Sequence, residues 1–248
     1  MKRQLALVYS YYNNRQMFLR QLEEWQLYSE RVKDRLEICI TDDCSMKEPL
    51  SQVVAFPDRV KGQAYQLTVK KSWNWLACRN LGACVAEADW LLLTDMDHLL
   101  SVPNAEELML ILGDLNPKYV YGLSRENSHK VLITPHTNSF LMTREMFWSI
   151  GGYDEELAGL YFGTTGTYRE RAFRVAEGYS MLGVRLTWFS RSEITDADTN
   201  EFYKDKYIDH YRLQKIQHKK QKENRSDSVK ILKYPYLQIY GEENNKAV

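Results

Sequence analysis

Two carboxylates and an imidazole directly follow a short apolar stretch. Their residue types and spacing are the ones in this sequence best suited to metal binding or catalysis. The stretch Trp90-Leu91-Leu92-Leu93-Thr94 is followed directly by Asp95-Met96-Asp97-His98. Side chains alternate along an extended segment, so Asp95 and Asp97 point to the same side. Two hard oxygen donors on one side make half of a divalent-cation site, and substrate phosphates can complete it. The same triplet also fits a solvated acidic turn after a strand, so by itself it leaves both interpretations open.

A second pair of carboxylates, Asp42 and Asp43, follows another predicted strand at residues 36–41. In open α/β sheets, ligands bind at the carboxyl ends of the strands. The two acidic pairs are therefore expected at the same edge of one sheet, provided that their strands run parallel.

The hydrophobic pattern predicts the elements that would position these residues. Predicted strands cover residues 5–10, 36–41, 89–94, 119–122, 138–142 and 179–188, with a further strand or extended arm at 229–236. Predicted helices cover residues 15–30, 72–87, 103–112, 144–150, 168–177 and 198–222. Residues 46–60 form a connection in which one short strand is expected near 53–56. This alternation predicts a Rossmann-like, three-layer α/β/α fold with a mostly parallel central sheet and room for antiparallel strands near the site.

The composition favours one soluble domain over a nucleic-acid-binding, transmembrane or zinc-finger protein. A chain of 248 residues with 44% hydrophobic content suits one large domain. Lys plus Arg and Asp plus Glu both number 33, so no overall positive charge favours nucleic acid. No apolar run approaches the roughly 18 residues of a transmembrane helix. The four cysteines show no metal-finger spacing. These features predict a cytoplasmic protein with reduced thiols.

Taken in order, the motifs resemble those of the GT-A glycosyltransferases, which use nucleotide-sugar donors, and especially their large inverting family. Thr41-Asp42-Asp43-Cys44-Ser45 is similar to the family's Val-Asp-Asp-Gly-Ser motif, with Cys44 in place of glycine. Cys78-Arg79-Asn80-Leu81-Gly82 resembles its Ala-Arg-Asn-x-Gly segment and precedes the Asp-x-Asp motif at the expected distance. Gly151-Gly152-Tyr153-Asp154-Glu155 is similar to its acceptor-side Gly-Gly-Phe-Asp-Glu turn. The resemblance covers about residues 5–175.

The resemblance implies a metal-dependent transferase with a UDP-sugar as the expected donor and a glycan or other hydroxyl-bearing polymer as acceptor. Asp43 would contact the base and Arg79 the diphosphate side. The implied donor-binding residues are Tyr11, Asp42, Asp43, Arg79 and Asp95. The implied ligands of Mn²⁺ or Mg²⁺ are Asp95 and Asp97, with His98 as either a ligand or a structural histidine. Residues 1–100 would form the nucleotide-binding half and 101–222 the acceptor half of one domain, followed by a C-terminal extension, 223–248.

One part of the family's pattern is missing. Inverting members carry a Glu-Asp pair whose aspartate is the general base that deprotonates the acceptor hydroxyl. If Arg171-Ala172 aligns with the family's Arg-Ala, Thr164 and Thr165 occupy these acidic positions. Three explanations remain open: Asp154 or Glu170 replaces the base, the enzyme is retaining, or transfer activity has been lost.

Several assignments are left open by the sequence. His129, His136, His210 and His218 are candidates for a further metal ligand, although packing or a surface position is the more common role of a histidine without an identified partner. The alternatives to a glycan transferase are a degenerate module that binds nucleotide-sugar or glycan, and a glycosyltransferase that acts on nucleic-acid bases, which the basic run 215–225 would suit. A nucleotidyltransferase would need a glycine-rich basic loop where Tyr11-Tyr12-Asn13-Asn14 stands.

Overall fold

The computed structural model describes residues 3–160, 164–197, 210–224 and 231–241. Its strands are β1 Leu5–Tyr11, β2 Leu36–Asp42, β3 Lys61–Leu67, β4 Trp90–Asp95, β5 His98–Leu100, β6 Tyr119–Asn127, β7 Leu132–Ile133, β8 Phe140–Thr143, β9 Gly178–Trp188 and β10 Tyr236–Tyr240. Its α-helices are α1 Arg15–Leu27, α2 Glu30–Lys33, α3 Trp75–Val85, α4 Val102–Ile111, α5 Arg144–Ser149, α6 Thr164–Val175 and α7 His210–Lys222. Short 3₁₀ turns cover Leu50–Gln52, Leu112–Asp114 and Glu155–Leu157.

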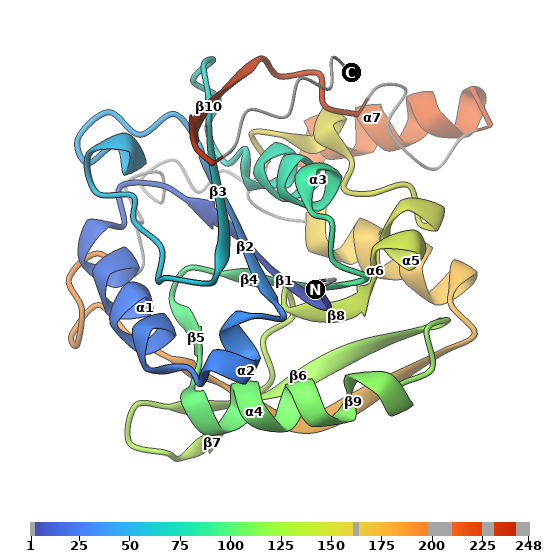
Figure 1. The fold of residues 1–248 in the computed structure, drawn as a ribbon. Helices are drawn as coiled ribbons and strands as arrows, with labels where there is room; N and C mark the ends of the chain where they lie inside the picture. The colour runs from blue at the N-terminus through green and yellow to red at the C-terminus, as the bar shows by residue number, and fades with distance from the viewer. Residues whose placement is uncertain (1–2, 161–163, 198–209, 225–230, 242–248) are drawn as a thin grey trace.

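One sheet runs through the molecule, with helices on both of its faces (Figure 1). Its strand order is β10-β3-β2-β1-β4-β8-β6-β9-β5, and β7 pairs with β6. Strands β3, β2, β1 and β4 are parallel, as are β6 and β9, whereas β8, β5 and β10 run antiparallel to their neighbours. The predicted three-layer α/β fold is confirmed, with its parallel centre and its antiparallel strands beyond β4.

The register of the central strands brings the two acidic pairs to one edge. Asp42 lies opposite Tyr11 in the β1–β2 pairing, and Asp95 lies opposite Ser10 in the β1–β4 pairing. Because all three strands run in the same direction, their carboxyl ends meet. The chemistry predicted from two separate motifs can therefore occur at one place.

Alternating side chains of β1 fill the two apolar layers. Leu5 and Leu7 pack in the cluster that includes Trp25 of α1, whereas Ala6 and Val8 pack on the opposite face of the sheet. Figure 1 shows α1, α2 and α4 on the first face and α3, α5 and α6 on the second. Within the described ranges, no helix is long and apolar enough to cross a membrane.

The sequence-based assignment was wrong at β3 and β5, which it missed, and at residues 53–56, which form no strand. β3 escaped detection because its buried face carries Gln63, whose side-chain amide donates to Glu37 at 2.7 Å. The expected helix at 198–222 is described from His210 onward, and residues 198–209 lie outside the described ranges. The strand expected at 229–236 begins only at Tyr236, as β10, which pairs with β3.

Gly82 lets α3 lie directly on β1. A Cβ atom at this position would stand 2.6 Å from Cγ1 of Val8, which is closer than carbon atoms pack. Gly82→Ala is therefore expected to lower the free energy of unfolding by about 1–3 kcal/mol, the usual cost of overpacking a core. Urea denaturation followed by circular dichroism measures the change. The matched control is Gly113→Ala, where the added methyl group meets nothing within 4 Å, and equal stabilities of the two variants would contradict the prediction.

Candidate functional site

Asp95 ends β4 with a partly open carboxylate. Its side chain is 34% exposed. Oδ1 accepts a hydrogen bond from Nη2 of Arg79 at 2.5 Å and a longer one from Nδ2 of Asn138 at 3.5 Å. Oδ2 lies 3.4 Å from Nε2 of His136. Burial would raise the pKa of Asp95, but the positive charge of Arg79 is the largest of the effects that outweigh burial and lower the pKa below its usual value. Asp95 is accordingly an ionised oxygen donor.

Arg79 supports this carboxylate from inside the protein. Its side chain is fully buried on α3. Besides Asp95, it donates through Nη1 to the carbonyl of Asn138 at 2.6 Å and to the hydroxyl of Tyr153 at 3.1 Å. The guanidinium also stacks 4.9 Å from the ring centroid of Trp75. In this structure the described polar contacts of the Arg79 guanidinium are all made inside the protein, and its contact with a diphosphate stays a prediction.

Asp97 follows in the turn between β4 and β5 and is held at both oxygens. Oδ1 accepts from Nδ1 of His98 at 2.7 Å, and Oδ2 accepts from Nε1 of Trp188 at 3.0 Å. The other ring nitrogen of His98 lies 3.4 Å from Nη1 of Arg125, and the imidazole is 1% exposed. Both ring nitrogens of His98 thus have partners inside the protein, and the contact with Asp97 is suited to orient that carboxylate.

His136 is the one later histidine candidate whose described side chain lies beside the carboxylates. Its ring stacks on that of His98 with centroids 4.1 Å apart, and its Nδ1 lies 2.9 Å from the hydroxyl of Ser139. Burial, followed by the neighbouring His98, lowers the pKa of His136 to about 3, so the ring is neutral at physiological pH. His129 and His218 are exposed on the surface, and the side chain of His210 lies outside the described part of the chain.

Asp95 and Asp97 provide only part of the ligand set that a divalent cation requires. Among the described residues, no group of three His, Cys, Asp or Glu side chains is arranged to hold a metal ion. Asp95 and Asp97 nevertheless offer carboxylate oxygens, each of which can accept more than the one or two hydrogen bonds it makes. Two carboxylates fit a cation that takes its other ligands from phosphate, as Mg²⁺ commonly does. They do not form a complete protein cage.

Asp42 and Tyr11 shape the loop beside β2. Asp42 is fully buried, and its two oxygens accept from the backbone N–H groups of Ser45 at 2.8 Å and Leu50 at 2.9 Å. The hydroxyl of Tyr11, also buried, donates to the carbonyl of Glu48 at 2.5 Å. Both predicted donor-site residues are thus committed to holding the loop that follows Asp43.

Asp43 has an unpaired oxygen. Oδ2 accepts from the backbone N–H of Asn74 at 2.9 Å, but Oδ1 is buried without a partner among the described residues. Both side-chain polar atoms of Asn74 are equally buried and unpaired within the described ranges. Buried polar atoms are nearly always hydrogen-bonded, so three adjacent exceptions indicate a place for a polar ligand. Asn74 was missed in the sequence, although its position just before α3 was the available signal.

The proposed base residues occupy different environments. Asp154 is 4% exposed, accepts from the backbone N–H of Glu156 at 3.1 Å and forms an ion pair with Lys220 of α7. These contacts indicate a structural role for Asp154. Glu170 is exposed on α6. Thr165, in contrast, faces the site: its hydroxyl lies 3.4 Å from Oδ1 of Asn138, whose amide nitrogen bonds Asp95.

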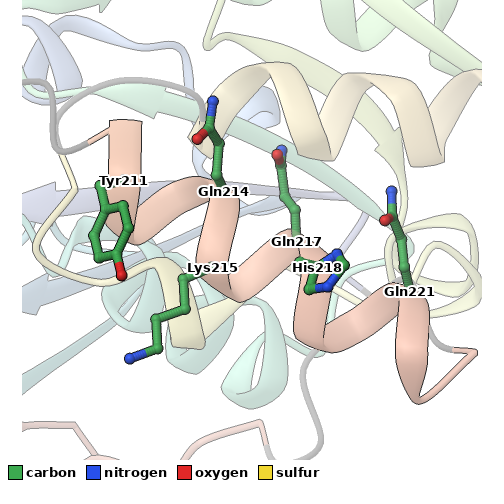
Figure 2. Close-up of a pocket in the computed structure, with 6 residues that line it drawn as sticks. All are labelled: Tyr211, Gln214, Lys215, Gln217, His218 and Gln221. Atoms are coloured by element: carbon green, nitrogen blue, oxygen red, sulfur yellow. The ribbon is translucent and has the colours of Figure 1, made fainter.

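A pocket of about 510 Å³ lies elsewhere, on the outer surface of α7 (Figure 2). Its lining comes from that helix alone: Tyr211, Gln214, Lys215, Gln217, His218 and Gln221. It contains neither a carboxylate nor any of the predicted donor residues, so it is separate from the site at the sheet edge.

Comparison with known proteins identifies the fold. No protein-family model and no curated protein sequence matches the chain. Among solved structures it is similar to residues 1–349 of TarS from S. aureus, a GT-A-type glycosyltransferase, with a TM-score of 0.60 and 15% identity over 78% of this chain and 63% of that one. The complex of that protein with UDP-GlcNAc gives a TM-score of 0.62 and 13% identity, over 77% and 60% of the two chains. Its complex with UDP gives 0.59 and 14%, over 78% and 63%.

This likeness extends over the domain but not over the whole of the neighbour. The chain spans 63% or less of the length of these structures and 38% of the longer TarS structure. At such low identity the comparison establishes the fold. The GT-A architecture that the sequence motifs implied is therefore confirmed.

Proposed function

We propose that the protein is a glycosyltransferase that moves a sugar from a nucleotide-diphosphate sugar to a hydroxyl group of a glycan or other polymer. A UDP-sugar is the expected donor and Mn²⁺ or Mg²⁺ the expected cofactor. Support comes from the GT-A fold, from the UDP and UDP-GlcNAc complexes of the structural neighbour, and from the two acidic pairs at the edge of the sheet.

The observation that carries the proposal is the set of unpaired polar atoms at Asp43 and Asn74. A uracil ring presents an N–H group between two carbonyl oxygens. The free Oδ1 of Asp43 can accept from that N–H group, and the side-chain amide of Asn74 can donate to a carbonyl. Burial raises the pKa of Asp43 well above its usual value, as expected of a carboxylate that awaits a hydrogen-bond donor.

Asp95 and Asp97 would hold the metal ion, which would neutralise charge on the departing nucleoside diphosphate. Neighbouring side chains of the protein hold these two carboxylates in position. Arg79 holds Asp95, while Trp188 and His98 hold both oxygens of Asp97. Prearranged groups of this kind need no reorganisation when charge develops, which is how electrostatic catalysis lowers a barrier.

The general base remains the open part of the mechanism. Thr165 lies next to Asn138 and occupies a position where the inverting family carries an acidic residue. A threonine hydroxyl does not act as a base at neutral pH. A retaining reaction dispenses with such a base. A degenerate module that binds nucleotide-sugar or glycan without turnover is the second candidate function, and Thr165 is the observation that favours it.

Incubation with a panel of UDP-, GDP- and TDP-sugars, with Mn²⁺ or EDTA, tests the proposal. Metal-dependent release of a nucleoside diphosphate is the expected result, and the anomeric configuration of the product distinguishes inversion from retention. Binding of UDP without turnover would support the degenerate module. Absence of both turnover and nucleotide binding would exclude the transferase and the nucleotide-sugar-binding module together.

Asp43→Asn is expected to weaken UDP binding by about 10- to 100-fold, because an amide can place an N–H group where the base needs an acceptor and leave a buried group unpaired. Isothermal titration calorimetry measures the affinity, with Asp114→Asn, an exposed acidic residue, as the control. In the wild type, acidification protonates Asp43 and removes the acceptor. Because burial raises its pKa, UDP affinity should begin to fall at a pH above the usual carboxyl range, and the asparagine variant should lack this fall. Unchanged affinity in Asp43→Asn would count against the assigned role.

A further inference from the structure

Residues 231–235, which we call the 231–235 segment, return to the carboxyl ends of the central strands just before β10. In β10, Leu237 lies opposite Gln66 of β3, and Gln66 lies opposite Asp42 of β2 (Figure 1). Because β10 runs antiparallel to β3, the residues that precede it continue past the carboxyl end of β3. Neighbouring strands are about 4.8 Å apart. The segment therefore approaches the end of β2, where Asp43 follows, from two strands away.

Hydrogen bonds fix the 231–235 segment at both ends. The carbonyl of Pro235 accepts from the backbone N–H of Thr68, just beyond β3, at 2.9 Å. At the other end, the backbone N–H groups of Leu232 and Lys233 donate to the carboxylate of Glu155 at 2.9 and 3.1 Å. The side chain of Glu155 is fully buried, so this anchor is part of the protein interior.

Tyr234, between the two anchors, packs on the side of the sheet where Asn74 meets Asp43. It packs against an apolar cluster that β3 and α3 share: Tyr65, Leu67, Ala77, Cys78 and Leu81. The N–H groups of Ala77 and Cys78 donate to the carbonyl of Asn74 at 3.0 and 3.3 Å. The N–H of Asn74 in turn donates to Oδ2 of Asp43 at 2.9 Å. The surface beneath Tyr234 thus begins in the first turn of α3, beside the unpaired atoms of the proposed base site.

The hydroxyl group of Tyr234 is available to a ligand. It makes no hydrogen bond within the described ranges, although a buried tyrosine hydroxyl usually has a partner. Nζ of Lys233 lies 5.2 Å from the ring centroid, so the ring itself is held on its own segment. Burial, followed by the negative charge of Glu155, raises the pKa of Tyr234, and Asp43 acts in the same direction. The hydroxyl is therefore protonated at neutral pH and can donate.

The strand order places this hydroxyl at the nucleoside end of the proposed donor. In the sequence β10-β3-β2-β1-β4, the segment lies beyond β3, whereas Asp95 ends β4, three strands away from β3. Three strand spacings amount to roughly 14 Å. A ligand with its diphosphate at Asp95 and its base at Asp43 would present the base, and not the phosphates, to the 231–235 segment.

We infer that the 231–235 segment completes the nucleotide site, and that the hydroxyl of Tyr234 donates a hydrogen bond to a carbonyl of the base. Uracil has a carbonyl on each side of its N–H group. Asp43 can accept from the N–H group, while Asn74 and Tyr234 donate to one carbonyl each. The inference rests on the proposed function, because it starts from the proposed base contacts. It adds part of the predicted extension 223–248 to a site expected from residues 1–100.

The experiment uses the full chain, Mn²⁺ and two probes, UDP and inorganic pyrophosphate, with affinities measured by isothermal titration calorimetry. Tyr234→Phe removes only the hydroxyl and is expected to weaken UDP binding by about 3- to 10-fold, the effect of one hydrogen bond. Pyrophosphate has no base, so its affinity should be the same in Tyr234→Phe and wild type. The control is Tyr240→Phe, at a tyrosine of β10 that is 42% exposed, and it should keep the wild-type affinity for UDP.

Each other outcome is informative. Equal UDP affinity in wild type and Tyr234→Phe would overturn the inference and leave the proposed function standing. A parallel loss of pyrophosphate affinity would place Tyr234 at the phosphates and also overturn it. Failure of the wild type to bind UDP would overturn the proposed function together with the inference.

Hydrogen exchange on the unaltered protein keeps the inference testable if Tyr234→Phe melts well below the wild type. UDP is expected to slow amide exchange in the 231–235 segment, because a bound base would hold it against α3. Slower exchange around Asp43 and Asn74 without any change in the segment would exclude the segment from the nucleotide site.

Discussion

If the protein transfers sugar as proposed, Asp97→Asn is expected to lower the rate by about 10³-fold or more, because the proposed cation would lose a charged ligand at the point where leaving-group charge develops. The substitution is nearly isosteric, but it places an amide N–H group against either the indole N–H of Trp188 or the ring N–H of His98. Two donors then face each other, and the side chain loses the orientation that both partners give it. Initial rates at several Mn²⁺ concentrations measure the effect.

The shape of the metal dependence makes this test specific. A lost ligand should raise the Mn²⁺ concentration needed for half-maximal rate, whereas general misfolding should lower the rate at every concentration. Asp58→Asn, at an exposed carboxylate, is the control and should keep the wild-type rate and metal dependence. A variant Asp97→Asn that retains both would remove Asp97 from the proposed metal site.

Arg79→Met is expected to lower the free energy of unfolding by about 3–5 kcal/mol, the usual cost of breaking a buried charge pair. The loss has three parts: Asp95 loses its counter-ion, and the carbonyl of Asn138 and the hydroxyl of Tyr153 lose their donor. Asp95 should also titrate at a higher pH, since the charge that lowers its pKa has gone. Urea denaturation at neutral pH measures the change in stability.

Arg59→Met provides the comparison for a surface ion pair. Arg59 donates to Asp34 through two nitrogens, yet its side chain is 47% exposed, so its removal should cost about 1 kcal/mol or less. If Arg79→Met were no more damaging than Arg59→Met, the buried arginine would have no supporting role. Arg79→Lys should fall between the two, because an ammonium group keeps the charge but cannot reproduce the planar fork.

The sequence predicted the location of the site better than its internal contacts. Asp42, Asp43, Asp95 and Asp97 follow predicted strands, and the parallel sheet necessarily brings the ends of such strands together. The partners of these carboxylates could not be predicted in the same way. Trp188 reaches Asp97 from β9, 91 residues further along the chain, and no local pattern contains that pairing.

Arg79 illustrates why a motif does not determine a residue's environment. A guanidinium in a phosphate-binding fold suggests contact with phosphate, but the stripe Leu76, Ala77 and Leu81 already turns α3 toward the core. That rotation carries Arg79 beneath Asp95. The sequence contained the helical pattern, but only the packing of α3 on the sheet shows which side of the carboxylate the arginine occupies.

The pairing of β10 with β3 has a consequence for how the protein is made. β10 follows β3 in the chain only after all the other strands, so during translation the outer edge of β3 exposes unpaired N–H and C=O groups until β10 has been made. The backbone bonds from Leu232 and Lys233 to Glu155 form equally late. A ribosome that stops after α7 would release a chain that contains Asp43, Asp95 and Asp97 but has an open sheet edge, which is a template for aggregation. Synthesis of β10 is therefore a condition for covering this edge of the sheet.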